Sequence, residues 1–204
     1  MSNFDQVVTQ WIAPSYRAAG RAWICSHVQV TGLSTSPSTV KVQSSVLIDG
    51  VDLKKSSEKA RGRLAYVPDE CPVYPFMTGG EFLRFVASTK RVKLDDSANE
   101  FIAAFGLREH LDARFDEMSL GTKKKMMLCA CWIGAPKALL LDEPSNGLDL
   151  ASREYLIQRL QQAAREKTIL FSAHDADFVL EIGAVTIEMT SLVGPTHLAR
   201  NWGH

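Results

Sequence analysis

The stretch ALLLDEPSNGLD, residues 138–149, decides the fold. Its first four residues, Ala138 to Leu141, form an uninterrupted apolar run of strand length, which is typical of a parallel strand covered on both faces. An amphipathic helical pattern follows over residues 152–165, and a second buried strand is predicted over residues 168–173. Strand, helix and strand at this spacing predict an α/β fold with a parallel sheet.

Polar residues follow both predicted strands. Asp142 and Glu143 come directly after the first strand, and His174 comes directly after the second. Ligands of open α/β sheets bind just beyond the carboxyl ends of the strands, so we expect these three side chains to converge there. Asp142 would suit a hydrated Mg²⁺, Glu143 would polarise a water for attack on a phosphate, and His174 would hold that phosphate or water. The alternative is a solvated turn before Pro144 and a structural histidine.

A predicted helix start lies shortly before this stretch. The segment MSLGTK, residues 118–123, places Ser119 as a candidate N-cap beside a glycine. Such a helix end presents free amides and a positive dipole, which together favour an anion. Taken in isolation, the segment favours the alternative interpretation, which is an ordinary capped helix with solvated Lys123, Lys124 and Lys125.

Other elements follow from local patterns. Residues 46–50 predict a strand that ends in a tight Asp-Gly turn, and residues 64–67 predict a short strand. Thr78 begins a predicted helix whose first residues resemble a capping box. A further helix is predicted over residues 97–105 and another after Ser119.

In combination, these segments resemble the ATPase subunits of ABC transporters. The resemblance is carried by MSLGTKKKMMLCACWIGAPKALLLDEPSNGLD at 118–149 and by FSAHD at 171–175. It implies a role for each matching residue. The signature motif falls on Ser119, Leu120, Gly121 and Thr122. Walker B, with its Mg²⁺ ligand, falls on Ala138 to Asp142, and the catalytic glutamate is Glu143. The D-loop falls on Ser145 to Asp149, and the switch histidine is His174.

The middle of the chain resembles the same family. VLIDGVDL, at 46–53, looks like the strand and turn after the family's first helix, and AYVPDECPVYPFMTGGEFLRF, at 65–85, looks like the Q-loop and the start of the helical subdomain in bacterial exporters. There are departures within the motifs. Leu120 replaces one of the signature's glycines, and Asp69 or Glu70 stands where the Q-loop usually has a glutamine, which adds a negative charge next to the phosphates.

One family motif is missing from the expected place. The family requires G-x-x-x-x-G-K-[ST] after its first core strand, because the loop amides and the lysine cradle the phosphates. Here His27 to Leu33 (HVQVTGL) alternates like that strand and runs into the Ser- and Thr-rich residues 34–45, with no Gly-Lys pair. Losing three or four hydrogen bonds to phosphate removes about 5 to 10 kcal/mol, which weakens a micromolar site beyond millimolar.

The resemblance implies a single ABC ATPase-like domain over residues 1–204, with a P-loop NTPase-like parallel-sheet core. It divides into an atypical N-terminal part without a P-loop (1–45), a small helical subdomain (about 72–117) and the core that carries the motifs (about 118–185). Its implied ligands are ATP and Mg²⁺, with Asp69 close to the nucleotide. Its implied partners are a second ABC ATPase subunit, like or unlike, and a membrane permease that docks on the aromatic segment 74–85 at the cytoplasmic face of the membrane.

Two other interpretations of the missing motif stay open. The chain is a degenerate subunit that lends Ser119 and Gly121 to ATP held by an intact partner, or it is a decayed product without independent activity.

Composition and charge argue against several other classes. The charges of the 23 basic and 23 acidic residues cancel. A local basic cluster lacks interleaved aromatics; it comprises Lys54, Lys55, Lys59, Arg61 and Arg63. A nucleic-acid partner is therefore not expected. No stretch approaches the roughly 18 apolar residues of a membrane span, and the N-terminus shows no secretory signal, so we expect a cytoplasmic or peripheral protein. The four cysteines form no CxxC pair, which disfavours a zinc site.

Overall fold

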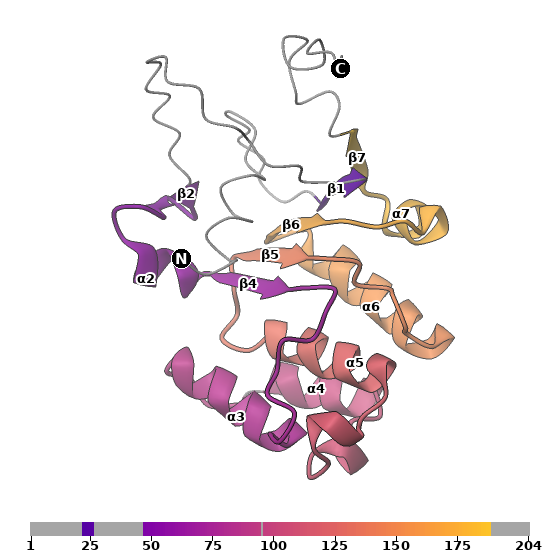
Figure 1. The fold of residues 1–204 in the computed structure, drawn as a ribbon. Helices are drawn as coiled ribbons and strands as arrows, with labels where there is room; N and C mark the ends of the chain where they lie inside the picture. The colour runs from indigo at the N-terminus through magenta and orange to yellow at the C-terminus, as the bar shows by residue number, and fades with distance from the viewer. Residues whose placement is uncertain (1–21, 27–46, 95, 189–204) are drawn as a thin grey trace, which may run out of the picture.

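The computed structural model describes residues 22–26, 47–94 and 96–188. A five-stranded sheet lies at its centre (Figure 1). The strand order is β4 (Leu64–Val67), β5 (Ala138–Leu141), β6 (Thr168–Phe171), β1 (Ala22–Ser26) and β7 (Val185–Glu188). All four neighbouring pairs are parallel. The predicted α/β fold with a parallel sheet is therefore confirmed.

The register brings the carboxyl ends of three strands to one level. Leu141 on β5 lies opposite Val67 on β4 and opposite Phe171 on β6. Two further backbone hydrogen bonds continue the ladder, because Asp142 N donates to Val67 O (2.8 Å) and Ser172 N donates to Leu141 O (3.0 Å). The residues that follow the three strands therefore emerge side by side.

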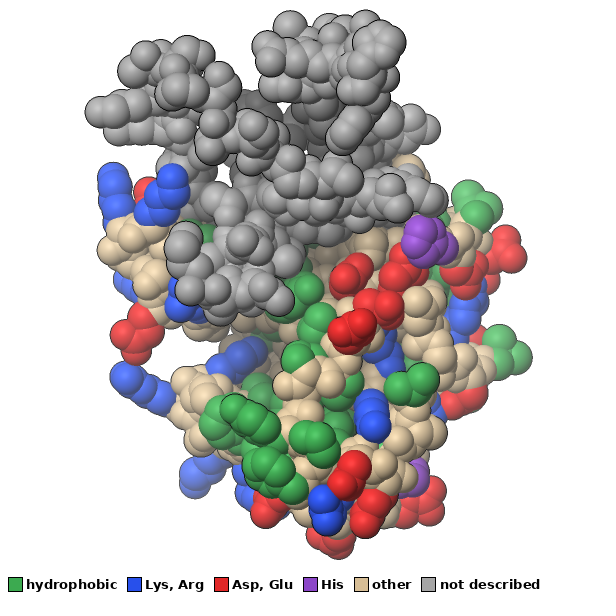
Figure 2. All heavy atoms as spheres, in the orientation of Figure 1, with side chains coloured by type: hydrophobic (Ala, Val, Ile, Leu, Met, Phe, Trp, Pro, Cys, Tyr) green, Lys and Arg blue, Asp and Glu red, His purple; other side chains and the backbone are tan. Residues whose placement is uncertain are grey.

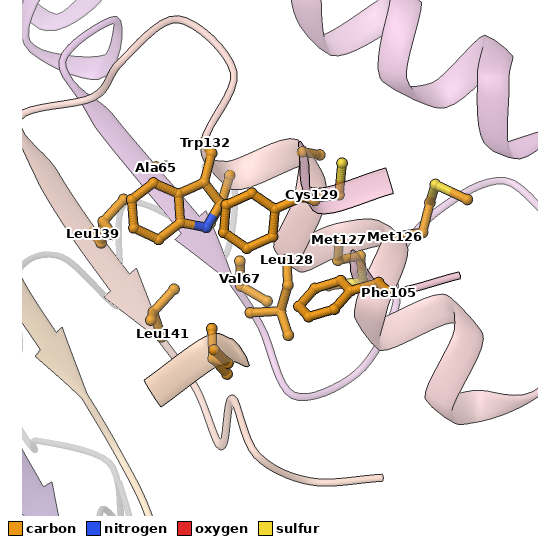
Figure 3. Packing of buried hydrophobic residues seen from close by; sticks show 14 of the residues in the cluster. Ala65, Val67, Phe105, Met126, Met127, Leu128, Cys129, Trp132, Leu139 and Leu141 are labelled. Carbon is orange, nitrogen blue, oxygen red and sulfur yellow. The ribbon is translucent and has the colours of Figure 1, made fainter. Parts of the chain in front are cut away.

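Most of the helices lie on one side of the sheet (Figure 1). They are α3 (Gly79–Thr89), α4 (Asp96–Ala104), α5 (Leu120–Cys131) and α6 (Leu150–Ala163), with α7 (Ala176–Ile182) near the sheet's other end. Leu139 and Leu141 of β5 point toward them into the main core, among Val67, Leu128 and Trp132 (Figure 3).

A second, smaller cluster covers the other face of β5. It is built by the hairpin of β2 (Leu47–Ile48) and β3 (Val51–Asp52) together with α2 (Ser57–Arg61). Ala138 and Leu140, both half-buried, pack there against Ile48, Ala60 and Leu64. Apolar residues therefore line both faces of β5, as expected, although the second face is less deeply buried among the described residues.

Local sequence signals placed most elements well. The strands at 64–67 and 138–141 match the prediction to the residue, and the turn after residue 48 closes the hairpin. The capping box is confirmed, since Glu81 N donates to Thr78 Oγ1 (3.2 Å) and Thr78 N donates to Glu81 Oε2 (2.9 Å). Helix α6 begins two residues before the prediction because Asp149, not a later residue, caps it.

The N-terminal prediction differs from the structure. Strand β1 is formed by Ala22–Ser26, in a part of the chain whose sequence showed only a weak helical pattern. The predicted strand at 27–33 and the Ser- and Thr-rich residues 34–45, where we expect no P-loop, lie outside the described residues. Because β1 ends at Ser26, 20 residues (27–46) separate it from β2, more than the loop 34–45 identified from the sequence.

Several short elements were not predicted, among them α2, α7 and β7. Helices of 5 and 7 residues are too short to show a helical period, and β7 carries no apolar run.

Candidate nucleotide site

The structure brings together the three polar residues that follow β5 and β6. His174 Nε2 lies 3.2 Å from Glu143 Oε1, and the backbone N of His174 donates to Glu143 Oε2 (3.2 Å). Glu143 is buried, with 7% of its surface exposed, whereas the His174 side chain is largely exposed. Glu143 and His174 therefore meet beyond the carboxyl ends of β5 and β6, where the sequence predicts that they converge.

Ser172 joins the two carboxylate residues. Its hydroxyl donates to Asp142 Oδ1 (2.5 Å) and accepts from the backbone N of Glu143 (3.0 Å). Glu143 adopts φ of +44°, a left-handed conformation that costs energy for a residue with a side chain. Ser172 was not predicted as a site residue, although its position directly after β6, the neighbour of β5, points to it.

These residues fit a Mg²⁺ ion held mainly by other ligands. Among the described residues, no group of three or more His, Cys, Asp or Glu side chains could hold a metal ion. Mg²⁺ characteristically takes one or two carboxylates and completes its shell with waters and phosphate oxygens. Asp142, oriented by Ser172, is a suitable carboxylate for that arrangement.

The predicted helix start is present at α5. Ser119 is its N-cap, and its hydroxyl accepts from Thr122 N (3.1 Å) and lies 2.9 Å from Thr122 Oγ1. Leu120 is 82% exposed. Gly121 packs against the backbone of Gly147, because a β-carbon on Gly121 would stand 2.5 Å from Gly147 O. The first turn of α5 and the segment 145–149 are therefore in direct backbone contact.

Asp149 caps α6 at the end of that segment. Its Oδ1 accepts from Ser152 N (2.9 Å), its Oδ2 is 3.1 Å from Ser152 Oγ, and Lys125 forms an ion pair with it. Its hydrogen bond with Lys125, together with that from Ser152 N, lowers the pKa of Asp149 to about 2. The contacts that the structure gives to this side chain are therefore those of a cap.

Two of the three lysines after Gly121, Lys124 and Lys125, are not simply solvated, which corrects the expectation of a helix with solvated lysines for these two residues. Lys125 is mostly buried and pairs with Asp149. Lys124 is buried and contacts Asp69, one of the two candidates for the Q-loop position. Burial lowers the pKa of Lys124, and the nearby Asp69 carboxylate opposes that effect. The spacing of three consecutive lysines gave no sign of which would face inward.

Figure 2 shows Asp and Glu side chains gathered near the middle of the face in view, with a histidine close by. No helix in the described residues is long and apolar enough to cross a membrane.

One protein family, ABC transporter, matches the sequence over residues 32–146. The chain is 29% identical over 153 residues to the probable multidrug ABC transporter ATP-binding protein YbhF of Escherichia coli, covering 72% of this chain and 26% of that protein. It is 30% identical over 137 residues to the ABC transporter ATP-binding protein NatA of Bacillus subtilis, covering 65% of this chain and 56% of that one. The chain thus spans about a quarter and about half of the length of these relatives.

Two solved structures share the fold. An ATP-binding subunit of an ABC transporter superposes with a TM-score of 0.63 at 22% identity, covering 78% of this chain and 70% of that chain. The ATP-binding cassette MJ0796, a dimer in a post-hydrolysis state bound to ADP and Pi, superposes with a TM-score of 0.64 at 16% identity, covering 82% and 80%. These likenesses confirm the predicted P-loop NTPase-like fold class.

Proposed function

The chain belongs to the ABC transporter family, and from that premise we propose that it is an ATP-binding subunit that couples ATP to export through a separate membrane permease. The observation that carries the proposal is the convergence of Asp142, Glu143 and His174 beyond β5 and β6. These residue types at this place suit phosphoryl chemistry, in which positioning and electrostatics supply most of the catalysis.

Each side chain has a role in the proposed reaction. Asp142, held by Ser172, would be a ligand of Mg²⁺, which would supply neutralisation of the charge on the phosphates. Glu143 accepts a proton from the attacking water, and burial in contact with His174 keeps its carboxylate in one orientation. His174 presents its exposed ring to the terminal phosphate. Asp69 is linked to Glu143 by Asn146. The side-chain Nδ2 of Asn146 donates to Asp69 Oδ1 (3.4 Å), and its backbone N donates to Glu143 O (3.1 Å).

In this proposal the chain alone binds ATP weakly, because its sequence has no Gly-Lys-Ser/Thr motif between β1 and β2. Calorimetric titration of the purified chain with Mg²⁺-ATP tests this point, with thermal unfolding as a control that the protein is folded. We expect no dissociation constant tighter than about millimolar, since the phosphate cradle is the largest source of affinity. A micromolar dissociation constant would mean that residues 27–46 form an unrecognised phosphate loop.

A second candidate function explains the incomplete site. The start of α5 has Ser119 as its N-cap and Gly121 against Gly147, and these two residues would contact ATP across a subunit interface in this function. A chain with that end but without a P-loop can complete the ATP site of an intact subunit while its own site stays silent. Co-purification with an intact ABC ATPase subunit favours this function over a decayed product.

The permease contact in this proposal is the aromatic segment before and within α3. Tyr74 and Phe76 are each 65% exposed and stack on each other with ring centroids 5.5 Å apart, and Phe85 is 56% exposed. Phe82 is different, because its ring packs edge-on against buried Phe115 in the core. Figure 2 shows hydrophobic side chains gathered over α3. Exposed aromatics in a cluster are characteristic of a protein interface.

A further inference from the structure

A lysine ammonium is buried next to the proposed nucleotide site. Lys124, one turn into α5, is 5% exposed. Its Nζ lies 2.8 Å from Asp142 O and 3.3 Å from Pro68 O. It also lies 3.3 Å from Asp69 Oδ1 and 3.5 Å from Asp69 O. Because an ammonium has three donors, these four oxygens account for its full hydrogen-bonding capacity.

The partners of Lys124 belong to segments that are far apart in the sequence. Pro68 and Asp69 begin the connection that leaves β4, and Asp142 is the first residue after β5. Lys124 itself comes from the helix that begins at Ser119. One side chain therefore ties the ends of two neighbouring strands to the first turns of α5.

Charge is matched within this contact. A buried ammonium is costly unless a carboxylate pairs with it, and Asp69 supplies that carboxylate from the half-exposed side. The negative charge that Asp69 adds at the Q-loop position is therefore not directed at the phosphates alone. Asp69 Oδ1 also accepts from Asn146 Nδ2 (3.4 Å), which extends the contact to the segment 145–149.

We propose that Lys124 is a positioning residue that, with Asp69, locks the connection after β4 and the peptide after β5 to the start of α5. Its effect is to hold Asp142 and Glu143 and the helix end at Ser119 in one fixed geometry. The proposal concerns the site of the proposed function, but it rests on contacts within the chain. Its test needs no ATP, so it can fail or succeed independently of that function.

A double-mutant cycle on the full chain tests the pairing. Unfolding by urea is measured for wild type, Asp69→Asn, Lys124→Gln and the double variant. We expect Asp69→Asn to lower the folded-to-unfolded ratio about tenfold when Lys124 is present and less than about twofold in the Lys124→Gln background, where the partner is a neutral amide. Additive effects of the two substitutions would overturn the pairing.

Lys90 provides a matched control. It is also a partly buried lysine, and it lies at the end of α3. Its Nζ donates to the carbonyl oxygen of Ile133 (2.8 Å). In a Lys90→Gln background, Asp69→Asn should have the same effect as in wild type. Dependence on Lys90 equal to that on Lys124 would show a general loss of stability and would contradict the proposal.

Amide hydrogen exchange tests positioning apart from stability. In Asp69→Asn, whose half-exposed side chain is expected to be tolerated, exchange should rise at the amides of Asp142, Glu143 and Asn146, which donate to Val67 O, Ser172 Oγ and Glu143 O. Exchange within α6 should stay unchanged. A uniform rise over α6 and these residues, or no rise at these residues, would overturn the positioning role.

Discussion

The backbones of Gly121 and Gly147 are in contact: a β-carbon added to Gly121 would stand 2.5 Å from the carbonyl oxygen of Gly147. Gly121 lies in the first turn of α5, and Gly147, at φ of +73°, lies in the turn that leads from β5 to α6. The helix end at Ser119 and the segment 145–149 therefore cannot move independently. Any group that displaces one of them displaces the other.

The first prediction concerns this contact. Gly121→Ala places a methyl group against a backbone oxygen that has no rotamer to change, so we expect the free energy of unfolding to fall by about 1–3 kcal/mol. Gly62→Ala is the control, because its β-carbon meets oxygens only at 3.5 and 3.6 Å. Urea denaturation measures both variants. Equal stability of the two would show that the Gly121 contact is not tight.

A second prediction concerns the cap of α6. Asp149→Ala removes the acceptor of Ser152 N and should cost about 1 kcal/mol, whereas Asp149→Asn keeps a capping oxygen and should cost less. Chemical denaturation at pH 7 measures both. If Asp149→Asn is as destabilising as Asp149→Ala, the pair with Lys125, rather than the cap, dominates.

The same residue predicts a dependence on pH. Because the pKa of Asp149 is lowered to about 2 from 3.8, its ionised form stabilises the folded state above pH 3.8, and this contribution is lost as the pH falls through about 2. The stability difference between wild type and Asp149→Asn should therefore be constant from pH 7 to 5 and shrink below pH 4. The effect should be small, since the side chain is 55% exposed. A difference that grows on acidification would contradict the assignment.

Ser172 gives a third prediction. Ser172→Ala removes a donor to the Asp142 carboxylate and leaves the amide of Glu143 without its acceptor, so we expect a loss of about 1–3 kcal/mol in the free energy of unfolding. Ser88→Ala, which removes an exposed hydroxyl from α3, should change it by less than about 0.5 kcal/mol. Matching small losses for both would mean that Ser172 does not organise the site.

The fourth prediction concerns the permease. A photocrosslinking residue at Phe76 should capture a co-expressed ABC permease, because Phe76 is exposed in the aromatic cluster of segment 74–85. The same residue at Glu166, exposed after α6 and away from this segment in the sequence, is the control. Mass spectrometry identifies the product. Capture from Glu166 but not from Phe76 would argue against docking through this segment.

Much of the fold was predictable because its signals are local. The apolar run at 138–141 and the Thr78 capping box each depend on a few neighbouring residues, and both were placed correctly. Strand β1 was not predicted, because AWICS at 22–26 does not alternate, and its parallel pairing with β6 and β7 joins residues more than 140 positions apart.

Part of the candidate site was also predictable from local signals. The placing of Glu143 and His174 follows from where two parallel strands end. The Ser172 bridge depends on the register between β5 and β6, and the burial of Lys124 depends on how α5 rotates against the sheet. Neither register nor rotation is encoded within a short window of sequence.

The central claim is that this chain takes part in ATP hydrolysis as an ABC ATPase subunit, either through its own Glu143 or, in the second candidate function, by donating the start of α5 to an intact partner. The most direct measurement is steady-state ATP hydrolysis by the chain reconstituted with an ABC ATPase subunit that carries a complete P-loop, for wild type, Ser119→Arg and Glu143→Gln, with Ser88→Arg as the control for added charge. The donating function predicts that Ser119→Arg, which places bulk and charge at the donated helix end, lowers the rate more than about tenfold, while Glu143→Gln and Ser88→Arg leave it nearly unchanged. An equal loss for Glu143→Gln and Ser119→Arg, or no loss for either, would contradict it.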